Sequence, residues 1–533
     1  MEDIGPLERT GRSALLGALL VAVVSIAAHV DSLPNDYVLD DIPAVVDNPA
    51  AHWPVDFSRI VTTNYWGDRP NYEKLTIYRP LATLSFALMD AYRPEGPSLQ
   101  RAVNLLVHAG CAVLVFLILL KCCTVWGAAL GGLLFAVHPV HTEAVIGVVS
   151  RAELLAAFFV LLGTFLWQRS FESRAQWSVG RRVSSALVMG LVFALALLSK
   201  ENGVTLWGVL LAFQLVHFLG QKQRSAIVQH LHIEIHGVMA LVLAGYLALR
   251  AAVLPAVLGG DVPYSDNPMV GGDFVVRWLT PFKVFLEYVG LLVSPAHLTI
   301  DYSLEHFKVA RSLGDWQGWA GLLLFAGLTG GALAAARRRP VPAVLLLSFF
   351  ATYSVISNLP FLSTIIMAER LIYLPSAFLL AAVASLGASA AQSGRWPGRI
   401  LAVGALLVAI LFAAGTAVRC REWRTPLDLY RAAVREAPDS AKSRHLLGLE
   451  LAMAGRPDEA LPHLQRSVEI NPENFKARTN LARALAALGR YDEALVHLKT
   501  VLTQAPGHRA ALDVVCGIFE RTGKPPAAGR VCR

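Results

Sequence analysis

The first 420 residues alternate between apolar runs and short polar loops, and the chain then becomes charged and amphipathic. A helix that crosses a membrane needs about twenty apolar residues, so the runs predict eleven crossings. Several runs are shorter than this, which is typical of helices that pack in a bundle and end at a wet cavity. The runs lie at about 13–30, 103–120, 124–137, 153–168, 183–198, 203–219, 235–257, 317–336, 341–357, 370–388 and 399–418.

One further run, from Val276 to Leu298, is long enough to span but carries Arg277, Lys283 and Glu287 and is interrupted by Pro281. A crossing here would place the arginines at 337–339 on the outer side of the membrane. We therefore expect a re-entrant or interfacial segment on the outer face.

The tail repeats with a period of 34 residues, and its turns show this most clearly. Asp458-Glu-Ala-Leu461 recurs as Asp492-Glu-Ala-Leu495, and residues 426–436 fit a lone second helix before the first repeat. This period with helix-forming stretches around a turn is typical of tetratricopeptide repeats. The sequence thus predicts a membrane domain at 1–418 and a short repeat domain at 419–533. The equivalent turn residues are Gly455, Gly489 and Gly523, and Pro438, Pro472 and Pro506.

Composition supports a membrane protein, since 55% of the 533 residues are hydrophobic and the mean hydropathy is +0.50. These values exclude a soluble enzyme. The net charge of +8 is spread over short loops with no nucleic-acid-binding stripe. The six cysteines lack metal-site spacing, but Cys516 and Cys532 can pair if the tail lies outside the cytoplasm. No cleavage site follows the first apolar run, which favours a retained anchor.

Basic loops are expected on the cytoplasmic side, and they predict the orientation of the helices. The loop after the first helix, with Asp40 and Asp41, then lies on the outer side, together with the acid, imidazole and mixed-charge clusters near the other helix ends. Ionisable groups at membrane depth are costly and are functional by default. The orienting residues are Arg9 and Arg12, Lys121, Arg169 to Arg182, Lys222 and Arg224, Arg337 to Arg339, and Arg395 and Arg399.

The adjacent carboxylates in Asn35-Asp-Tyr-Val-Leu-Asp-Asp-Ile-Pro43 suit a general base at the bilayer surface. Alternatively, Asp41 caps a short helix that begins at Ile42-Pro43. Adjacent residues point in different directions, so one aspartate is expected to face a substrate. The sequence favours Asp41 for this role.

The candidate cations each have a structural alternative. His138 and His141 can bond free carbonyls at helix ends, and their spacing without a nearby cysteine argues against zinc. Lys200 can pair with Glu201, and Arg370 with Glu369. Arg79 can bind a lipid head group.

In its motifs the chain resembles the transmembrane and tetratricopeptide-repeat-containing O-mannosyltransferases of the GT-C glycosyltransferase superfamily. The resemblance covers most of residues 13–420, and relatives typically carry more repeats. It implies an all-α fold, a polytopic GT-C type helix bundle of about eleven membrane helices followed by a short repeat solenoid. The motifs are Val38-Leu-Asp-Asp41, Tyr78-Arg-Pro-Leu81, Asn104-Leu-Leu-Val-His108, Phe135-Ala-Val-His-Pro-Val-His-Thr-Glu-Ala144, Leu198-Ser-Lys-Glu-Asn202, Asp301-Tyr-Ser303, Ser357-Asn-Leu359 and Ala368-Glu-Arg-Leu-Ile-Tyr-Leu-Pro-Ser376.

The resemblance implies transfer of a sugar, mannose or another hexose, from a polyprenyl or dolichyl phosphate to an acceptor hydroxyl, with inversion. A carboxylate of Asp40-Asp41 takes the proton, and cations stabilise the leaving phosphate. The expected phosphate-binding residues are Arg79, His138, His141, Lys200 and Arg370, and the expected supporting residues are Glu143, Arg151, Glu201, Asp301 and Glu369.

We expect membrane lipids, a lipid-linked sugar and a protein acceptor or partner of the repeats as binding partners, and no nucleic acid or cofactor. The sequence offers no metal-ligating residues and leaves the metal requirement of the reaction open. The active site and the repeats are expected on the periplasmic or lumenal side. Two other functions stay open: a membrane scaffold that recruits partners through its repeats, and a transporter of lipid-linked sugar. A scaffold predicts no clustering of acids and bases on one face. A transporter predicts charges in the middle of the membrane and inverted repeats.

Overall fold

The computed structural model describes residues 10–67, 76–92, 96–171, 173, 176–220, 232–254, 262, 264, 266–302, 306–392 and 398–523. Six residues named above lie outside these ranges: Arg9, Lys222, Arg224, Ser303, Arg395 and Cys532. Within the ranges the secondary structure is helical, with no strand.

The chain divides into two compact units. The first, here the bundle unit, comprises Met1–Leu298 and Val309–Arg424, and the second, the repeat unit, comprises Thr299–Lys308 and Thr425–Arg533. The boundary lies a few residues after the expected one because the last bundle helix continues to Glu422, and Thr425 then caps the next helix by accepting from the Asp428 N–H. The segment around Asp301 joins the repeat unit, which the sequence did not predict.

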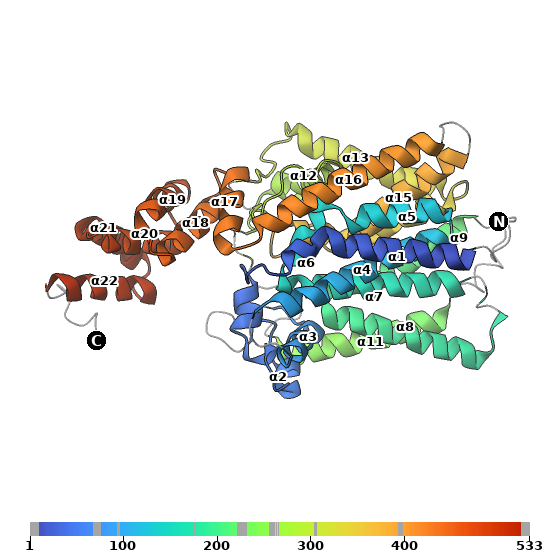
Figure 1. Cartoon of the computed structure of the whole chain (residues 1–533), viewed down its shortest axis with the longest axis horizontal. Helices are drawn as coiled ribbons and strands as arrows, with labels where there is room; N and C mark the ends of the chain where they lie inside the picture. The colour runs from blue at the N-terminus through green and yellow to red at the C-terminus, as the bar shows by residue number, and fades with distance from the viewer. Residues whose placement is uncertain are drawn as a thin grey trace. The chain divides into compact units, whose positions relative to one another are not determined.

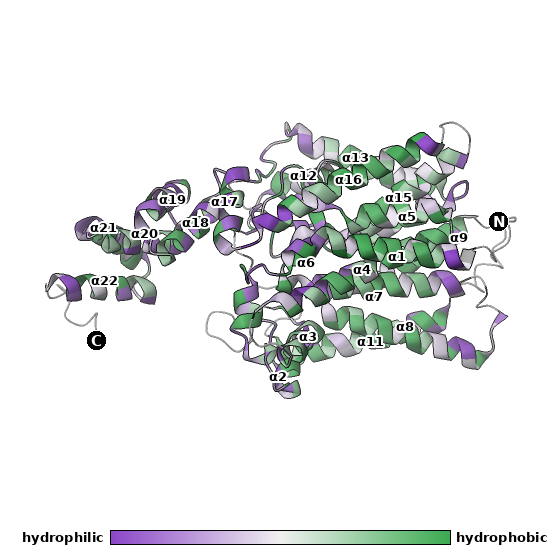
Figure 2. Ribbon diagram, viewed as in Figure 1, coloured by the Kyte–Doolittle hydropathy of each residue, from purple (hydrophilic) through white to green (hydrophobic). Residues whose placement is uncertain are grey.

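Long apolar helices form the bundle unit, and Figure 1 shows several of them running side by side. Figure 2 shows that hydrophobic residues dominate along their length. The helices are α1 (Thr10–His29), α2 (Phe57–Thr62), α3 (Pro80–Asp90), α4 (Ser98–Leu120), α5 (Val125–Ala136), α6 (Thr142–Ile146), α7 (Arg151–Ser170), α8 (Val179–Ser199), α9 (Thr205–Gly220), α11 (Ile233–Val253), α12 (Phe274–Val293), α13 (Trp316–Ala335), α14 (Pro340–Tyr353), α15 (Tyr373–Gln392) and α16 (Gly398–Glu422).

Nine helices in the described part of the chain are long and apolar enough to cross a membrane. A tenth crossing forms if α5 and the segment Pro139–Ile146, which bend by 49° at Val137–His138, count as one span. The remaining predicted crossing corresponds to α14, an apolar helix of only 14 residues. The described residues thus contain fewer than the eleven predicted membrane-crossing helices, because Pro139 interrupts one run and α14 ends early, at Tyr353.

The ambiguous run at 276–298 folds as the continuous helix α12, with Pro281 inside it, and does not turn back on itself. It packs along α13 so closely that a Cβ at Gly321 would lie 2.0 Å from the carbonyl oxygen of Phe282. Its aromatic contacts reach Phe325, half-way along α13, and Tyr353 at the end of α14. The re-entrant alternative is therefore wrong for this segment, whereas the interfacial alternative stays a prediction.

Six helices pair successively in the repeat unit, as the 34-residue period predicts. Gly455, Gly489 and Gly523 follow the first helix of each repeat with φ of +74°, +76° and +65°, a conformation that glycine adopts without strain. The lone helix expected at 426–436 is α17. The helices are α17 (Pro426–Glu436), α18 (Ala441–Met453), α19 (Pro457–Ile470), α20 (Phe475–Ala487), α21 (Tyr491–Gln504) and α22 (Arg509–Thr522).

Candidate active site

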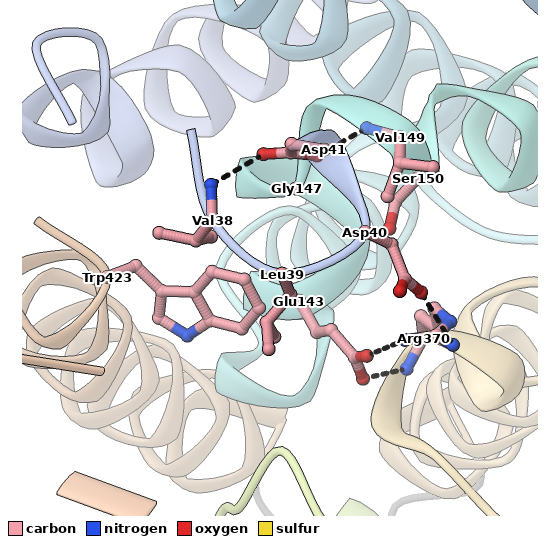
Figure 3. A pocket seen from close by; sticks show the side chains of 10 residues that line it. All are labelled: Val38, Leu39, Asp40, Asp41, Glu143, Gly147, Val149, Ser150, Arg370 and Trp423. Atoms are coloured by element: carbon pink, nitrogen blue, oxygen red, sulfur yellow. Dashed lines mark hydrogen bonds and ion pairs between the residues drawn. The ribbon is translucent and has the colours of Figure 1, made fainter. Parts of the chain in front are cut away.

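A small recess lies where the loop after α1 meets the end of α6, the start of α7 and the segment before α15 (Figure 3). Both aspartates and Arg370 line it, so the structure brings together residues that are more than 300 positions apart. The lining residues are Val38, Leu39, Asp40, Asp41, Glu143, Gly147, Val149, Ser150, Arg370 and Trp423.

The two aspartates have opposite environments. The Asp41 side chain is fully buried, and its carboxylate accepts hydrogen bonds from the Val149 N–H at 2.8 Å and the Val38 N–H at 3.3 Å. Asp40 is 48% exposed and points toward Arg370, with 3.9 Å between Oδ2 and Nη2 (Figure 3). The expectation that Asp41 faces a substrate does not fit this arrangement, because its oxygens already bind backbone N–H groups. The structure favours Asp40.

Burial raises the pKa of the Asp41 carboxyl to about 6. The Val149 N–H and the charge of Arg101 act in the opposite direction, but burial is the larger effect. Asp41 therefore takes up a proton at a higher pH than an exposed aspartate does, although it is still mostly ionised at neutral pH.

Arg370 is the cation of the recess, and a buried carboxylate orients it. Glu143 accepts a hydrogen bond from the guanidinium at Nη1 and another, 2.9 Å long, from the Arg370 backbone N–H. The Glu143 side chain is 5% exposed, whereas that of Arg370 is 29% exposed. The structural alternative, in which Arg370 pairs with Glu369, is not what the structure shows, since Glu143 is the partner. Glu369 instead lies 3.7 Å from Arg419.

Arg101 positions the aspartate loop, and the sequence reasoning missed it. Its buried guanidinium donates to the carbonyls of Asn35 and Asp36 and, at 3.1 Å, to that of Ile146. The signal in the sequence is that Arg101 lies near the start of an otherwise apolar helix, because a charge buried there needs hydrogen-bond partners. Leu39 also marks the loop, since its φ of +51° is strained for a residue with a branched side chain.

A second group of cations lies near the recess. Lys200 pairs with the buried Glu153, while Arg79 and Arg250 both contact Glu201, at 3.2 and 3.3 Å. Burial lowers the pKa of Lys200, Glu153 raises it, and the charges of Arg79 and Arg370 lower it again. The predicted cations Arg79, Lys200 and Arg370 therefore share one electrostatic environment. Each of the three also has a carboxylate partner. The partner of Lys200 is Glu153, not the neighbouring Glu201 that the sequence offered as an alternative.

The predicted histidines lie inside the bundle. With His29 and His108 they form a column of four rings, here the histidine column, whose successive centroids are 4.9 Å (29–108), 6.0 Å (108–141) and 5.4 Å (141–138) apart. His138 accepts from the Val140 N–H and bonds the Leu292 carbonyl; His141 bonds the Phe135 carbonyl and the Ser376 hydroxyl. Both are fully buried. We therefore withdraw them as phosphate ligands, because both nitrogens of each ring are already bonded.

Two further predicted residues serve other contacts. Arg151 is fully buried and joins α7 to the start of α4 through Asn104 Oδ1 at 2.8 Å and the Gln100 carbonyl at 2.6 Å. Asp301 belongs to the repeat unit, where it accepts a hydrogen bond from Ser440. Arg151 thus supports the site from behind, and Asp301 supports the first repeat.

Trp423 forms one wall of the recess and was not predicted. It is 2% exposed, and its indole N–H has no hydrogen-bond acceptor among the described residues. A buried donor without a partner costs about 1–3 kcal/mol. Across the described ranges, no three His, Cys, Asp or Glu side chains are grouped to hold a metal ion.

Curated relatives agree with the motifs. Protein O-mannosyl-transferase TMTC1 of Homo sapiens is 28% identical over 497 residues, which cover 85% of this chain and 55% of that protein. TMTC4 of Mus musculus is 29% identical over 489 residues, 84% of this chain and 65% of its own length. This chain is related to the protein O-mannosyl-transferases. It spans between half and two thirds of the length of these relatives.

The tail matches the family model described as a tetratricopeptide repeat over residues 451–514, which confirms the repeat prediction. Among solved structures, the Archaeoglobus fulgidus oligosaccharyltransferase tethered with an acceptor peptide is 13% identical, covering 84% of this chain and 58% of that chain with a TM-score of 0.46. This similarity is distant.

Proposed function

We propose that this chain is a membrane glycosyltransferase that moves a sugar, with mannose the first candidate, from a polyprenyl phosphate to a protein hydroxyl. One observation carries the proposal. A half-exposed carboxylate, Asp40, faces the guanidinium of Arg370 across a recess at one end of a bundle of membrane helices. The relationship to protein O-mannosyl-transferases supports the sugar and the acceptor class.

In the proposed reaction the acceptor oxygen attacks the anomeric carbon while the bond from that carbon to the phosphate oxygen breaks. Asp40 accepts the hydroxyl proton, a role that needs a base within hydrogen-bond reach and open to substrate. The phosphate leaves as a weakly basic anion, so no general acid is required. A single displacement inverts the anomeric carbon.

Arg370 is the proposed first contact of the leaving phosphate, because it is the most exposed of the three predicted cations and lines the recess. Glu143 orients it from the buried side, and Lys200 and Arg79 add positive potential. Such preorganised charges stabilise the charge that develops on the phosphate as the bond breaks. The clustering of these groups at one end of the bundle argues against a simple anchor for a scaffold.

Arg370 and Asp40 lie close together, with 3.9 Å between Nη2 and Oδ2. A sugar attacked from one side and released from the other must lie between the base and the phosphate ligand. The 3.9 Å between these two side chains therefore has to widen when the donor enters. Glu143 keeps Arg370 ordered during this change, since its two hydrogen bonds do not involve Asp40.

We also propose that the recess and the repeat unit face the periplasm or lumen. Lys121 follows the end of α4 whose first turn binds the aspartate loop, and Arg399 begins α16, which Trp423 of the recess follows. Both residues therefore lie at the helix ends away from the recess, and positive loops stay in the cytoplasm. Labelling with a membrane-impermeant thiol reagent in intact cells tests this. Lys499→Cys, on exposed α21, should react above the wild-type background, and protection until lysis would reverse the orientation.

The direct test of function is turnover by the purified protein with mannosyl-phosphopolyprenol and a serine- and threonine-rich peptide. We expect a mannosylated peptide, with the configuration of its linkage opposite to that of the donor by NMR. Glucosyl and galactosyl donors define the sugar preference. Retention of configuration would reject the single displacement, and absence of transfer with every donor and peptide would reject the glycosyltransferase assignment.

A further inference from the structure

Two neighbouring cysteines, Cys122 and Cys123, lie in the turn between α4 and α5, away from the residues of the proposed reaction. Hydrogen bonds fix this turn on both sides. The Leu119 carbonyl accepts from the N–H groups of both cysteines, at 2.9 and 2.8 Å, and Thr124 caps α5 by accepting from the Gly127 N–H at 3.2 Å. The two thiols therefore have a defined place in the structure.

The turn lies where the membrane meets water. α4 is long and apolar enough to cross the membrane and ends at Leu120, and the apolar helix α5 begins at Val125, so the cysteines lie between two apolar helix ends. Lys121 and Trp126, on either side of them, are exposed. Both are side chains typical of the boundary between lipid and water. An apolar group attached to either thiol can therefore enter the lipid beside these helices.

The surface of the bundle beside the turn is apolar as well. A Cβ at Gly17 of α1 would lie 3.5 Å from the side chain of Val125, so the first half of α1 packs against the start of α5. Leu15 and Leu16, which precede Gly17, are exposed, as expected of side chains that face lipid. α5 has 12 residues, about 18 Å of helix, whereas the hydrocarbon core is about 30 Å thick. A hydrocarbon chain attached at the turn would lie along apolar side chains, next to a helix shorter than the membrane.

The two thiols interact with each other, and this interaction favours a reactive sulfur at Cys123. The two Sγ atoms are 4.0 Å apart, and in the uncharged pair the Cys122 thiol donates to the Leu119 carbonyl at 3.2 Å. When Cys123 loses its proton, the Cys122 thiol can donate to the thiolate instead, which lowers the pKa of Cys123 and raises that of Cys122. The thiolate is the nucleophilic form of cysteine.

The other cysteines in the described part of the chain are closed to such a reaction. Cys111 and Cys420 are free thiols but fully buried, and Cys516 is disulfide-bonded. Cys122 and Cys123 are partly exposed. A disulfide between these two is disfavoured, because consecutive Cα atoms are about 3.8 Å apart and disulfides need about 4.4–6.8 Å.

We propose that Cys123 is a site of S-acylation, with a long-chain acyl thioester such as an acyl-coenzyme A as the donor. The Cys123 sulfur attacks the acyl carbonyl carbon, a carbon–sulfur bond forms, and the bond from that carbon to the donor sulfur breaks. The donor leaves as a thiol and takes up a proton in place of the one that Cys123 lost, so no oxidant or reductant is consumed. Cysteines next to membrane helices are common acceptors of this modification.

The attached chain enters the lipid beside α5 and holds the turn at the membrane surface. With the recess on the periplasmic or lumenal side, as proposed above, the turn faces the cytoplasm, where thiols stay reduced. Only the side of the membrane on which the donor is met rests on that orientation. The reaction itself rests on the geometry of the turn.

The test uses the full-length protein in lipid nanodiscs, which leave both faces accessible, incubated with palmitoyl-coenzyme A and followed by intact mass spectrometry. We expect one acyl chain per protein, released by neutral hydroxylamine as a thioester is, and mapped by proteolysis to Cys123. Acetyl-coenzyme A is the control donor and should react more slowly, because its short acyl group does not bring the thioester to the lipid surface. No sugar donor and no intact cell are needed, so failure here is separate from failure of the transferase assignment or of the orientation.

Cys123→Ser should abolish the adduct, whereas Cys111→Ser, which removes a buried thiol from α4, should leave it unchanged. Cys122→Ala removes the hydrogen-bond donor, so acylation should slow about threefold or more at pH 7 and reach its plateau at a higher pH. Loss of packing alone would not shift this pH profile. The mapping in the wild type does not depend on whether any variant folds. Absence of the adduct there, its location on another residue, or equal rates with acetyl-coenzyme A would overturn the proposal.

Discussion

The recess and the histidine column use similar residue types and end in opposite roles. In the recess, Asp40 and Arg370 keep 48% and 29% of their side chains exposed and approach without a hydrogen bond. In the column, His138 and His141 are fully buried, and each ring nitrogen has a partner. A polar side chain near a membrane helix end is thus a candidate for chemistry only where it keeps an open side.

This comparison also explains why both regions looked alike in the sequence. Ionisable residues at helix ends are costly whether they serve substrate or bond backbone, so residue type and position along the helix do not separate the two. What separates them is which carbonyls the fold leaves free. The bend of 49° between α5 and the following helices frees backbone groups, and the histidines bind them.

The largest effect should follow the loss of the proposed base. Asp40→Asn removes the proton acceptor while changing little volume, so kcat should fall about 10²–10⁴-fold, with an unchanged melting temperature. Turnover of mannosyl-phosphopolyprenol is the measurement, and Asp47→Asn, an exposed aspartate on the same loop, is the matched control. Near-normal turnover in Asp40→Asn would mean that the open side of the recess is not where the acceptor binds.

Removing the recess cation should have the next largest effect. Arg370→Gln should lower kcat about 10²–10³-fold and raise KM for the donor, since contacts to the phosphate strengthen as the bond breaks. Polyprenyl phosphate should raise the melting temperature of the wild type but not of this variant.

Arg370 also joins helices through Glu143, so a folding defect has to be distinguished from lost phosphate binding. Arg59→Gln, at an exposed position on α2, controls for the general loss of an arginine. A large fall in the melting temperature of ligand-free Arg370→Gln, with the ligand-induced rise intact, would assign Arg370 to helix packing alone.

The sequence predicted the membrane bundle, the repeats and the segments that form the recess, because apolar run length, the 34-residue period and polar helix ends are local properties. It could not predict partners, which depend on contacts between distant segments. Arg370 binds Glu143 and Lys200 binds Glu153, yet each has an acid next to it in the chain. Likewise, the choice between Asp40 and Asp41 depends on Val149, more than 100 residues away.

The histidine column should affect stability and leave donor binding unchanged. His138→Leu leaves the Val140 N–H and the Leu292 carbonyl without their partner, and each unpaired buried group costs about 1–3 kcal/mol. We expect a clear drop in melting temperature with an unchanged donor KM in the folded fraction. A raised donor KM at a normal melting temperature would instead return His138 to the phosphate site.

Asp41 combines features of both regions, because it lines the recess but is as buried as the histidines of the column. Its folded-state pKa of about 6 lies above the ordinary value of 3.8. The stability it contributes is therefore fully present below about pH 4 and is lost as the pH rises through 6, up to about 3 kcal/mol in total. An asparagine side chain does not titrate, so the stability difference between the wild type and Asp41→Asn should shift toward the variant from pH 4.5 to 7.5.

The measurement is the melting temperature of both proteins in detergent across this range, and the difference between them removes the contributions of all other groups. A flat difference for Asp41→Asn would show that Arg101 and the two backbone N–H groups fully offset burial. Asp41 would then be an ordinary carboxylate at every pH tested. The choice between the two aspartates would rest on exposure alone.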